Sequence, residues 1–412
     1  MKILIYSYNY HPEPIGIAPL MTELAEGLVK RGHEVRVVTG MPNYPERRIY
    51  EGYRGKLYQT EERNGVKLQR CYVWIRPQPG FIDRALLEIS FVATSFFQAL
   101  NGWKPDVIFL TIPPLPAAVP AAVLKWIFRC PLVVNLQDIL PDAAVHTGLM
   151  SNQAMIKVFT WLEKFAYRFA DRISVIADGF VDNLRDKGVP AQKLALISNW
   201  VDTDFIQPAP AGSNKDKNPF RIENNLTGKF IILYSGNIAR TQGLETLIQA
   251  AMHLRDCPEI AIVIVGEGKA RDELQALRDE LGADNVSLLP FQPRELLPQM
   301  LAAADLGLVM QKGNVIAFNM PSKIQVLLAS GLPIVASVPA IGTAAQAVRN
   351  SQGGRTLPPE DPEKLAQVIR ELYESPETVA ELSANARQFA LENYAFASAL
   401  DRYEALFKSL KS

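Results

Sequence analysis

One stretch in the second half of the chain has a hydrophobic pattern that predicts a strand, a loop, a helix and another strand. Residues 306–310 form a short apolar run, as buried strands do. Residues 323–329 carry apolar side chains at helical spacing, and Gly331 predicts the end of that helix. The apolar run 334–336 then predicts a second buried strand. This order is typical of a parallel α/β fold.

The same alternation runs along the whole chain and predicts two doubly wound α/β domains. Short apolar runs alternate with segments of helical periodicity in both halves. The expected strands are 2–8, 34–39, 107–111, 132–136 and 173–176 in the first half, and 229–236, 260–265, 286–289, 306–310 and 334–336 in the second. The first strand lacks a following G-x-G-x-x-G, so we do not expect a dinucleotide site.

Proline, glycine and polar residues concentrate at 207–219 without any periodicity, which indicates a linker. We therefore expect a first Rossmann-like domain at 1–206, a linker at 207–228 and a second Rossmann-like domain at 229–393. The last segment, 394–412, is expected to form a helix that packs back on the first domain. Two such domains are expected to face a cleft, because ligands bind at the carboxyl ends of parallel strands.

Two long apolar segments, 81–103 and 115–128, raise the question of a membrane. The first is interrupted by charged residues, and the second is short and broken by Pro116 and Pro120. Neither supplies the roughly 20 clean apolar residues that a spanning helix needs, so both are predicted to be core helices. Their aromatic and basic residues leave open that the protein docks on a membrane surface.

Composition narrows the class of protein further. Lys+Arg and Asp+Glu balance at 43 each, which argues against nucleic-acid binding driven by bulk charge. The three cysteines have no metal-binding or redox spacing. The first residues read as a strand rather than a signal peptide, so we expect a cytoplasmic location.

Lys323 is the first candidate for function, because a cation in the first turn of a helix opposes the helix dipole. An anion bound there would offset that cost, since free N–H groups and the ammonium would converge on it. The alternative is a solvated surface lysine.

Two positions in the first half are further candidates. Gly16, in the loop after the first strand, would let backbone N–H groups approach a ligand, or it is a simple turn glycine. Asp138 follows the strand 132–136, where carboxylates are well placed for catalysis. Asp138 and Asp142 could equally be turn or helix-capping residues.

Five motifs in order make the chain resemble a glycosyltransferase of the GT-B fold, from the large family four of retaining enzymes. The motifs are Gly16 with Arg31-Gly32-His33-Glu34-Val35, Ile197-Ser198-Asn199-Trp200-Val201-Asp202, Tyr234-Ser235-Gly236-Asn237, Val265-Gly266-Glu267-Gly268, and Pro321-Ser322-Lys323 through Ala329-Ser330-Gly331-Leu332-Pro333. The segment 234–245 is most similar to the subgroup that builds colanic-acid-type exopolysaccharides.

The resemblance implies a first domain on the acceptor side and a second domain that binds the nucleotide sugar. It implies that the donor, a UDP- or GDP-sugar, is bound by Gly16, Gly236, Asn237, Arg240, Gly266, Phe291, Gln292, Ser322 and Lys323. It implies a glycan or polyprenyl-linked acceptor and contact with the inner membrane face. No cofactor or metal is expected; Asp202-Thr203-Asp204 imitates a metal motif of a different transferase fold.

The sequence also departs from the family pattern. Two glutamates usually flank this helix, and Phe318 and Val326 stand at their positions. Gln242 replaces a usual lysine, and Gln137 stands where a histidine is common. These departures leave two alternatives to a transferase: a non-catalytic GT-B-fold partner subunit, or a nucleotide-sugar epimerase.

Overall fold

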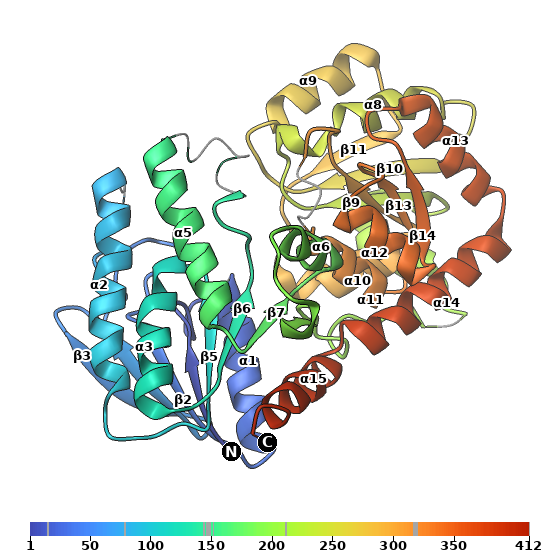
Figure 1. Cartoon of the computed structure of the whole chain (residues 1–412). Helices are drawn as coiled ribbons and strands as arrows, with labels where there is room; N and C mark the ends of the chain where they lie inside the picture. Colours follow the sequence, from blue (N-terminus) through green and yellow to red (C-terminus); the bar gives the residue numbers. More distant parts are fainter. Residues whose placement is uncertain are drawn as a thin grey trace. The chain divides into compact units, whose positions relative to one another are not determined.

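The computed structural model describes residues 1–14, 16–77, 80–142, 145, 150, 152–210, 212–315 and 320–411. The chain divides into two compact units, Met1–Asn199 with Leu400–Ser412, and Trp200–Ala399. Each unit is built on one sheet, with helices on both of its faces (Figure 1). The predicted fold class, two parallel-sheet α/β domains, is confirmed.

Unit 1 has an eight-stranded sheet in the order β3-β4-β2-β1-β5-β6-β7-β8. All neighbouring strands are parallel except the antiparallel pair β3 and β4. The strands are β1 (Lys2–Tyr6), β2 (Glu34–Gly40), β3 (Tyr58–Arg63), β4 (Val66–Cys71), β5 (Val107–Ile112), β6 (Leu132–Leu136), β7 (Arg172–Val175) and β8 (Leu194–Leu196). The sequence pattern did not predict β3, β4 or β8.

Helices cover both faces of this sheet. They are α1 (Ile17–Lys30), α2 (Phe81–Ala99), η1 (Leu115–Ala117), α3 (Ala118–Phe128), α5 (Gln153–Phe169), α6 (Asp178–Asp186), η2 (Ala191–Lys193) and the later part of α15 (Phe396–Lys408). On one face Tyr6 packs against Phe91 of α2, and on the other Phe109 packs against Tyr403 and Phe407 of α15. Among the described residues, no helix is both long and apolar enough to cross a membrane.

Unit 2 has a six-stranded sheet, all parallel, in the order β11-β10-β9-β12-β13-β14. Alternate residues of β9 enter two separate cores, with Ile231 and Leu233 on one face and Ile232 and Tyr234 on the other. The strands are β9 (Phe230–Ser235), β10 (Ile260–Val265), β11 (Val286–Leu289), β12 (Leu306–Met310), β13 (Ile334–Ser337) and β14 (Gly354–Leu357).

The helices of unit 2 complete its two outer layers. They are η3 (Lys215–Lys217), α7 (Pro219–Glu223), η4 (Arg240–Gln242), α8 (Glu245–Met252), α9 (Arg271–Leu281), η5 (Arg294–Leu296), α10 (Leu297–Ala303), α11 (Lys323–Ala329), α12 (Thr343–Ser351), α13 (Pro362–Tyr373), α14 (Pro376–Asn393) and the start of α15. The expected helix at 323–329 is present, and Gly331 beyond its end has φ +66°.

The segment 207–228, predicted as a linker, contains η3 and α7 and is bound to the sheet of unit 2. Asp305, just before β12, accepts hydrogen bonds from Lys215 Nζ (2.7 Å), Arg221 Nη2 (2.7 Å) and the backbone N–H of Ile231 (2.8 Å). The Arg221 side chain is only 4 % exposed, and Asp305 is the closer of its two carboxylate partners, the other being Asp216 at 3.3 Å.

We predict that Asp305→Ala lowers the free energy of unfolding by about 3 kcal/mol, because it removes the closer and less exposed of the two carboxylates that pair with the buried guanidinium of Arg221. Urea denaturation of the full chain measures this. Asp256→Ala is the matched control: it removes an exposed ion pair with Arg370, which contributes about 1 kcal/mol at most. Equal losses in the two variants would contradict the prediction.

Candidate active site

The candidate donor residues of unit 2 follow four neighbouring parallel strands. Gly236, Asn237 and Arg240 follow β9, Gly266 follows β10, Phe291 and Gln292 follow β11, and Ser322 and Lys323 come after β12. Because parallel strands place their carboxyl ends at the same edge of a sheet, these residues share one edge of unit 2.

Backbone packs directly on backbone at this edge. Gly236 donates its N–H to Val265 O (3.0 Å), and Ile238 donates to Glu267 O (2.8 Å). A Cβ on Gly266 would lie 1.9 Å from Gly236 O, and one on Gly268 would lie 2.2 Å from Ile238 O. Both glycines have a φ above +150°. Only glycine fits at these two positions, for both steric and conformational reasons.

The amine of Lys323 lies against this glycine loop. A Cβ on Gly236 would stand 3.1 Å from Lys323 Nζ, and Nζ lies 3.8 Å from the centre of the Tyr234 ring. The residue as a whole is half-buried, yet Nζ itself is shielded from solvent and has no hydrogen-bond partner among the described residues. This burial lowers the pKa of Lys323 to about 7. The amine is therefore not the solvated surface lysine that the alternative interpretation requires.

The start of α11 positions that amine. Ile324, Leu327 and Leu328 are buried in the core of unit 2, as the helical spacing predicted. Ser322 precedes the helix and is exposed, and its side chain caps no N–H group. Val326, at one of the usual glutamate positions, packs partly buried against the core. Phe318, at the other, lies outside the described residues.

The remaining donor candidates are more exposed. Arg240 is 77 % exposed and forms an ion pair with Glu273, which raises its pKa. Phe291 is 70 % exposed, so its ring is free to stack on a planar group. Gln292 donates to Pro290 O (3.1 Å). The carbonyl of Asn237 accepts a hydrogen bond from the Tyr234 hydroxyl (2.8 Å).

Sequence reasoning missed Arg271, in the first turn of α9. Its Nη1 donates to Gly266 O (2.8 Å) and Leu289 O (3.1 Å), which ties together the ends of β10 and β11. The signal that singled out Lys323, a cation at a helix start, is also present at Arg271.

Gln242, which replaces the usual lysine, has a structural contact: its Oε1 accepts from the Tyr234 hydroxyl (3.3 Å). A lysine is nevertheless present nearby, because the side chain of Lys312 would contact a Cβ on Gly243 at 3.2 Å. Lys312 pairs with Glu245, which raises the pKa of the lysine.

Unit 1 carries the other two candidates at the carboxyl edge of its own sheet. Gly16 caps the start of α1 with φ +72°, and a Cβ on this glycine would meet no atom within 4 Å. Asp138 follows β6. The residue as a whole is exposed, but desolvation of its carboxyl by the surrounding atoms raises its pKa. Beside it, Gln137 and Asn199 exchange hydrogen bonds of 3.2 and 2.8 Å.

The neighbouring aspartates have structural contacts. Asp142 pairs with Lys187 (2.9 Å) and accepts from Asn183 Nδ2 (3.1 Å). Asp202 accepts from the N–H groups of Asp204 (3.1 Å) and Phe205 (2.9 Å), as a turn residue does. Within the described part of the chain, no three His, Cys, Asp or Glu residues gather as metal ligands would.

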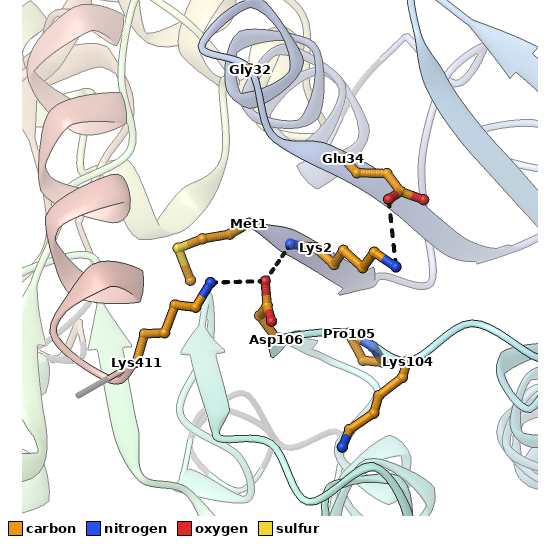
Figure 2. Close-up of a pocket in the computed structure, with 8 residues that line it drawn as sticks. All are labelled: Met1, Lys2, Gly32, Glu34, Lys104, Pro105, Asp106 and Lys411. Carbon is orange, nitrogen blue, oxygen red and sulfur yellow. Dashed lines mark hydrogen bonds and ion pairs between the residues drawn. The ribbon is translucent and has the colours of Figure 1, made fainter.

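Figure 2 shows a pocket of unit 1. Met1, Lys2 and Asp106 line it at the amino ends of β1 and β5. Asp106 accepts from the Lys2 N–H (2.7 Å) and pairs with Lys411 (3.5 Å). Because the pocket lies at the amino ends of these strands, it is separate from Gly16 and Asp138, which follow the carboxyl ends of strands.

Solved structures identify the class of this fold. The chain aligns over its full length with Anabaena Alr3699/HepE in complex with UDP, with a TM-score of 0.72 and 22 % identity, covering 100 % of both chains. Sucrose-phosphate synthase from Thermosynechococcus elongatus matches with a TM-score of 0.71 and 19 % identity, over 100 % of this chain and 99 % of that one. The two parallel-sheet units are those of the GT-B class.

Sequence comparisons then give the family. Residues 16–200 match the glycosyl transferase 4-like domain, and residues 215–389 match the glycosyl transferases group 1. WcaI of Escherichia coli K12, named for colanic acid biosynthesis, is 34 % identical over 90 % of this chain and 92 % of its own. The alpha-D-kanosaminyltransferase of Streptomyces kanamyceticus is 24 % identical over 71 % of this chain and 74 % of its own. The chain belongs to the group 1 glycosyltransferases and is a glycosyltransferase, as the resemblance implied.

We predict that Lys323→Met stabilises the protein at neutral pH. The pKa of Lys323 is about 7 in the folded chain, below its ordinary 10.5. The unfolded chain therefore binds the extra proton between these values, and wild-type stability rises with pH across this window. The variant lacks this penalty, which is still nearly complete at pH 7, and should be more stable there by about 4 kcal/mol.

The difference in unfolding free energy between Lys323→Met and the wild type should shrink as pH approaches 10. Urea denaturation at several pH values measures this difference. Lys312→Met is the control, because the pKa of Lys312 is raised by Glu245 and its removal should not stabilise. A gap between Lys323→Met and wild type that does not change with pH would contradict the assignment.

Proposed function

We propose that this glycosyltransferase moves a sugar from a UDP- or GDP-sugar to a glycan or lipid-linked acceptor in exopolysaccharide biosynthesis. The observation that carries the proposal is the shielded Lys323 amine, 3.1 Å from the Cβ position of Gly236 and without a hydrogen-bond partner among the described residues. The UDP complex of the HepE protein and the name of WcaI support the donor and the pathway class.

The chemistry of transfer explains why such an amine is useful. The bond between the sugar C1 and the diphosphate oxygen breaks, and negative charge develops on the departing nucleoside diphosphate. A cation placed there beforehand, in a site shielded from water, stabilises that charge by about 2 to 4 kcal/mol. Lys323 is proposed to supply it together with the loop of Gly236 and Gly266, without a metal, while the exposed Phe291 ring stacks on the base.

The second proposed role belongs to Asp138. A carboxylate with a raised pKa at the carboxyl edge of a parallel sheet is suited to accept the proton of the acceptor hydroxyl. We propose that the product keeps the anomeric configuration of the donor, and NMR of the product tests this directly.

The first experiment measures free UDP and GDP released from a panel of sugar nucleotides, with and without a bacterial lipid extract. We expect release from one donor that rises with the extract and persists in EDTA. Lys323→Met should reduce this turnover about 100-fold, as the loss of one preplaced donor does. Nucleotide binding without release from any donor would contradict transfer and favour a binding subunit.

Asp138→Asn should lower kcat about 100-fold or more and leave the KM for the donor nearly unchanged, because a catalytic carboxylate acts in the transition state. Asp142→Asn is the matched control: its carboxylate pairs with Lys187, so the change should reduce stability rather than turnover. Wild-type kcat in Asp138→Asn would assign Asp138 to turn formation instead.

A further inference from the structure

Three neighbouring helices of unit 1 present a large apolar surface, which we call the α2-α3-α5 face. The helices lie side by side along one face of the sheet (Figure 1). They carry ten of the twenty large apolar side chains exposed in the described chain: Leu86, Ile89, Phe97, Val119, Val123, Trp126, Ile127, Val158, Trp161 and Phe169. Monomeric proteins rarely expose contiguous apolar patches of this kind without a partner.

These helices are apolar on their inner and outer sides alike. In α3, Ala121 and Leu124 are buried inward, while Val123 and Trp126 point outward, the latter 80 % exposed. Trp161 of α5 is 60 % exposed. Core packing therefore accounts for only one side of each helix, and the outer side needs a second apolar environment.

Helix α5 brings exposed charges of one sign to this face. On α5, each exposed charged side chain is cationic: Lys157, Lys164 and Arg168. None of them has an ion-pair partner in the described part of the chain. The whole chain, by contrast, carries 43 residues of each sign.

The carboxylates of the same helices are hydrogen-bonded, paired with a cation or buried. Glu163 is buried against Lys187 (2.5 Å) and Tyr167 (2.9 Å). Asp83 accepts from Trp74 Nε1 (3.1 Å) and the Gly80 N–H (3.1 Å). Burial raises the pKa of Glu88 to about 7, so this side chain is partly protonated at neutral pH.

We propose that the α2-α3-α5 face docks on the surface of an anionic lipid bilayer. Indole rings favour the interface between headgroups and acyl chains, and lysine and arginine stems reach past apolar side chains to anionic headgroups. On α5, Lys157, Trp161 and Lys164 follow one another at helical spacing. Protein interfaces are instead depleted of lysine, so a lipid surface fits this mixture better than a protein partner.

This proposal deepens the lipid-linked acceptor of the proposed function, but its evidence comes from a different surface. Docking would hold the acceptor-side unit where a lipid-linked acceptor is concentrated. The two proposals can fail separately, because vesicle binding needs no turnover and transfer to a water-soluble acceptor needs no vesicle.

The test is co-sedimentation of the full chain with vesicles of phosphatidylcholine alone, or with about one third phosphatidylglycerol. We expect binding that requires the anionic lipid and weakens at high salt. Lys157→Glu with Lys164→Glu should reduce the partition coefficient at least about fivefold for each cation lost. Lys217→Glu with Lys364→Glu, on exposed positions of unit 2, is the matched control and should bind as wild type.

The apolar side chains are tested separately. Trp126→Glu with Trp161→Glu should abolish sedimentation, and Ile222→Glu, at an exposed apolar position of unit 2, should not. Trp126→Phe with Trp161→Phe should keep binding but lose most of the lipid-induced blue shift of tryptophan fluorescence. Of the three remaining tryptophans, Trp103 and Trp200 are buried, and Trp74 is half-buried and donates its Nε1–H to Asp83.

Three results would overturn the proposal. They are absence of binding to anionic vesicles, equal binding by the α2-α3-α5 variants and their controls, and lipid-free dimerisation that the Trp126→Glu/Trp161→Glu variant removes. The last result would show that a second copy of the chain covers this face.

Discussion

The burial of the Lys323 amine is the constraint on which the donor site depends. A lysine in contact with a tyrosine ring and a glycine backbone, with no carboxylate partner among the described residues, destabilises the folded chain at neutral pH. The core contacts of Ile324 and Leu328 hold α11 in place despite this cost. A bound anion would offset this stability cost, because its oxygens would place negative charge beside the amine, where the described chain has no carboxylate. The proposed affinity for a diphosphate and the reduced stability would thus both follow from the position of this one amine.

The glycine loops of unit 2 let the backbone pack closely beside that amine. Gly266 and Gly236 are packed so closely that a single methyl group would collide with a carbonyl oxygen. The loops of β9 and β10 therefore act as one backbone surface, and Arg271 fixes it by binding the carbonyls of Gly266 and Leu289. Glycines in such loops are what allows phosphate groups to approach the backbone in other α/β folds, which is the reason for proposing a diphosphate here.

Sequence patterns predicted which strands and helices carry the candidate site residues, but not the contacts that these residues make. Parallel strands dictate that the residues after β9, β10, β11 and β12 share an edge, so that part followed from alternation alone. The β3–β4 hairpin was missed because Tyr58–Arg63 is polar and half-exposed along its length. The ion pair of Arg240 with Glu273 and the shielding of Lys323 by Tyr234 join residues far apart in sequence, which periodicity cannot reveal. The segment 207–228 looked like a linker because its anchor, Asp305, lies in a different element.

The total numbers of cationic and anionic residues do not show which cations lack a carboxylate partner. Equal numbers of cations and anions exclude bulk attraction to nucleic acids, yet they do not require each cation to have a neighbour of opposite sign. Arg31, Arg221 and Arg370 are each paired with carboxylates of this chain. Lys323 in unit 2 and the exposed cations of α5 in unit 1 are not paired among the described residues. Both proposals rest on cations that lack a carboxylate partner and lie beside a second feature: the glycine loop for a diphosphate, and the apolar face for lipid headgroups.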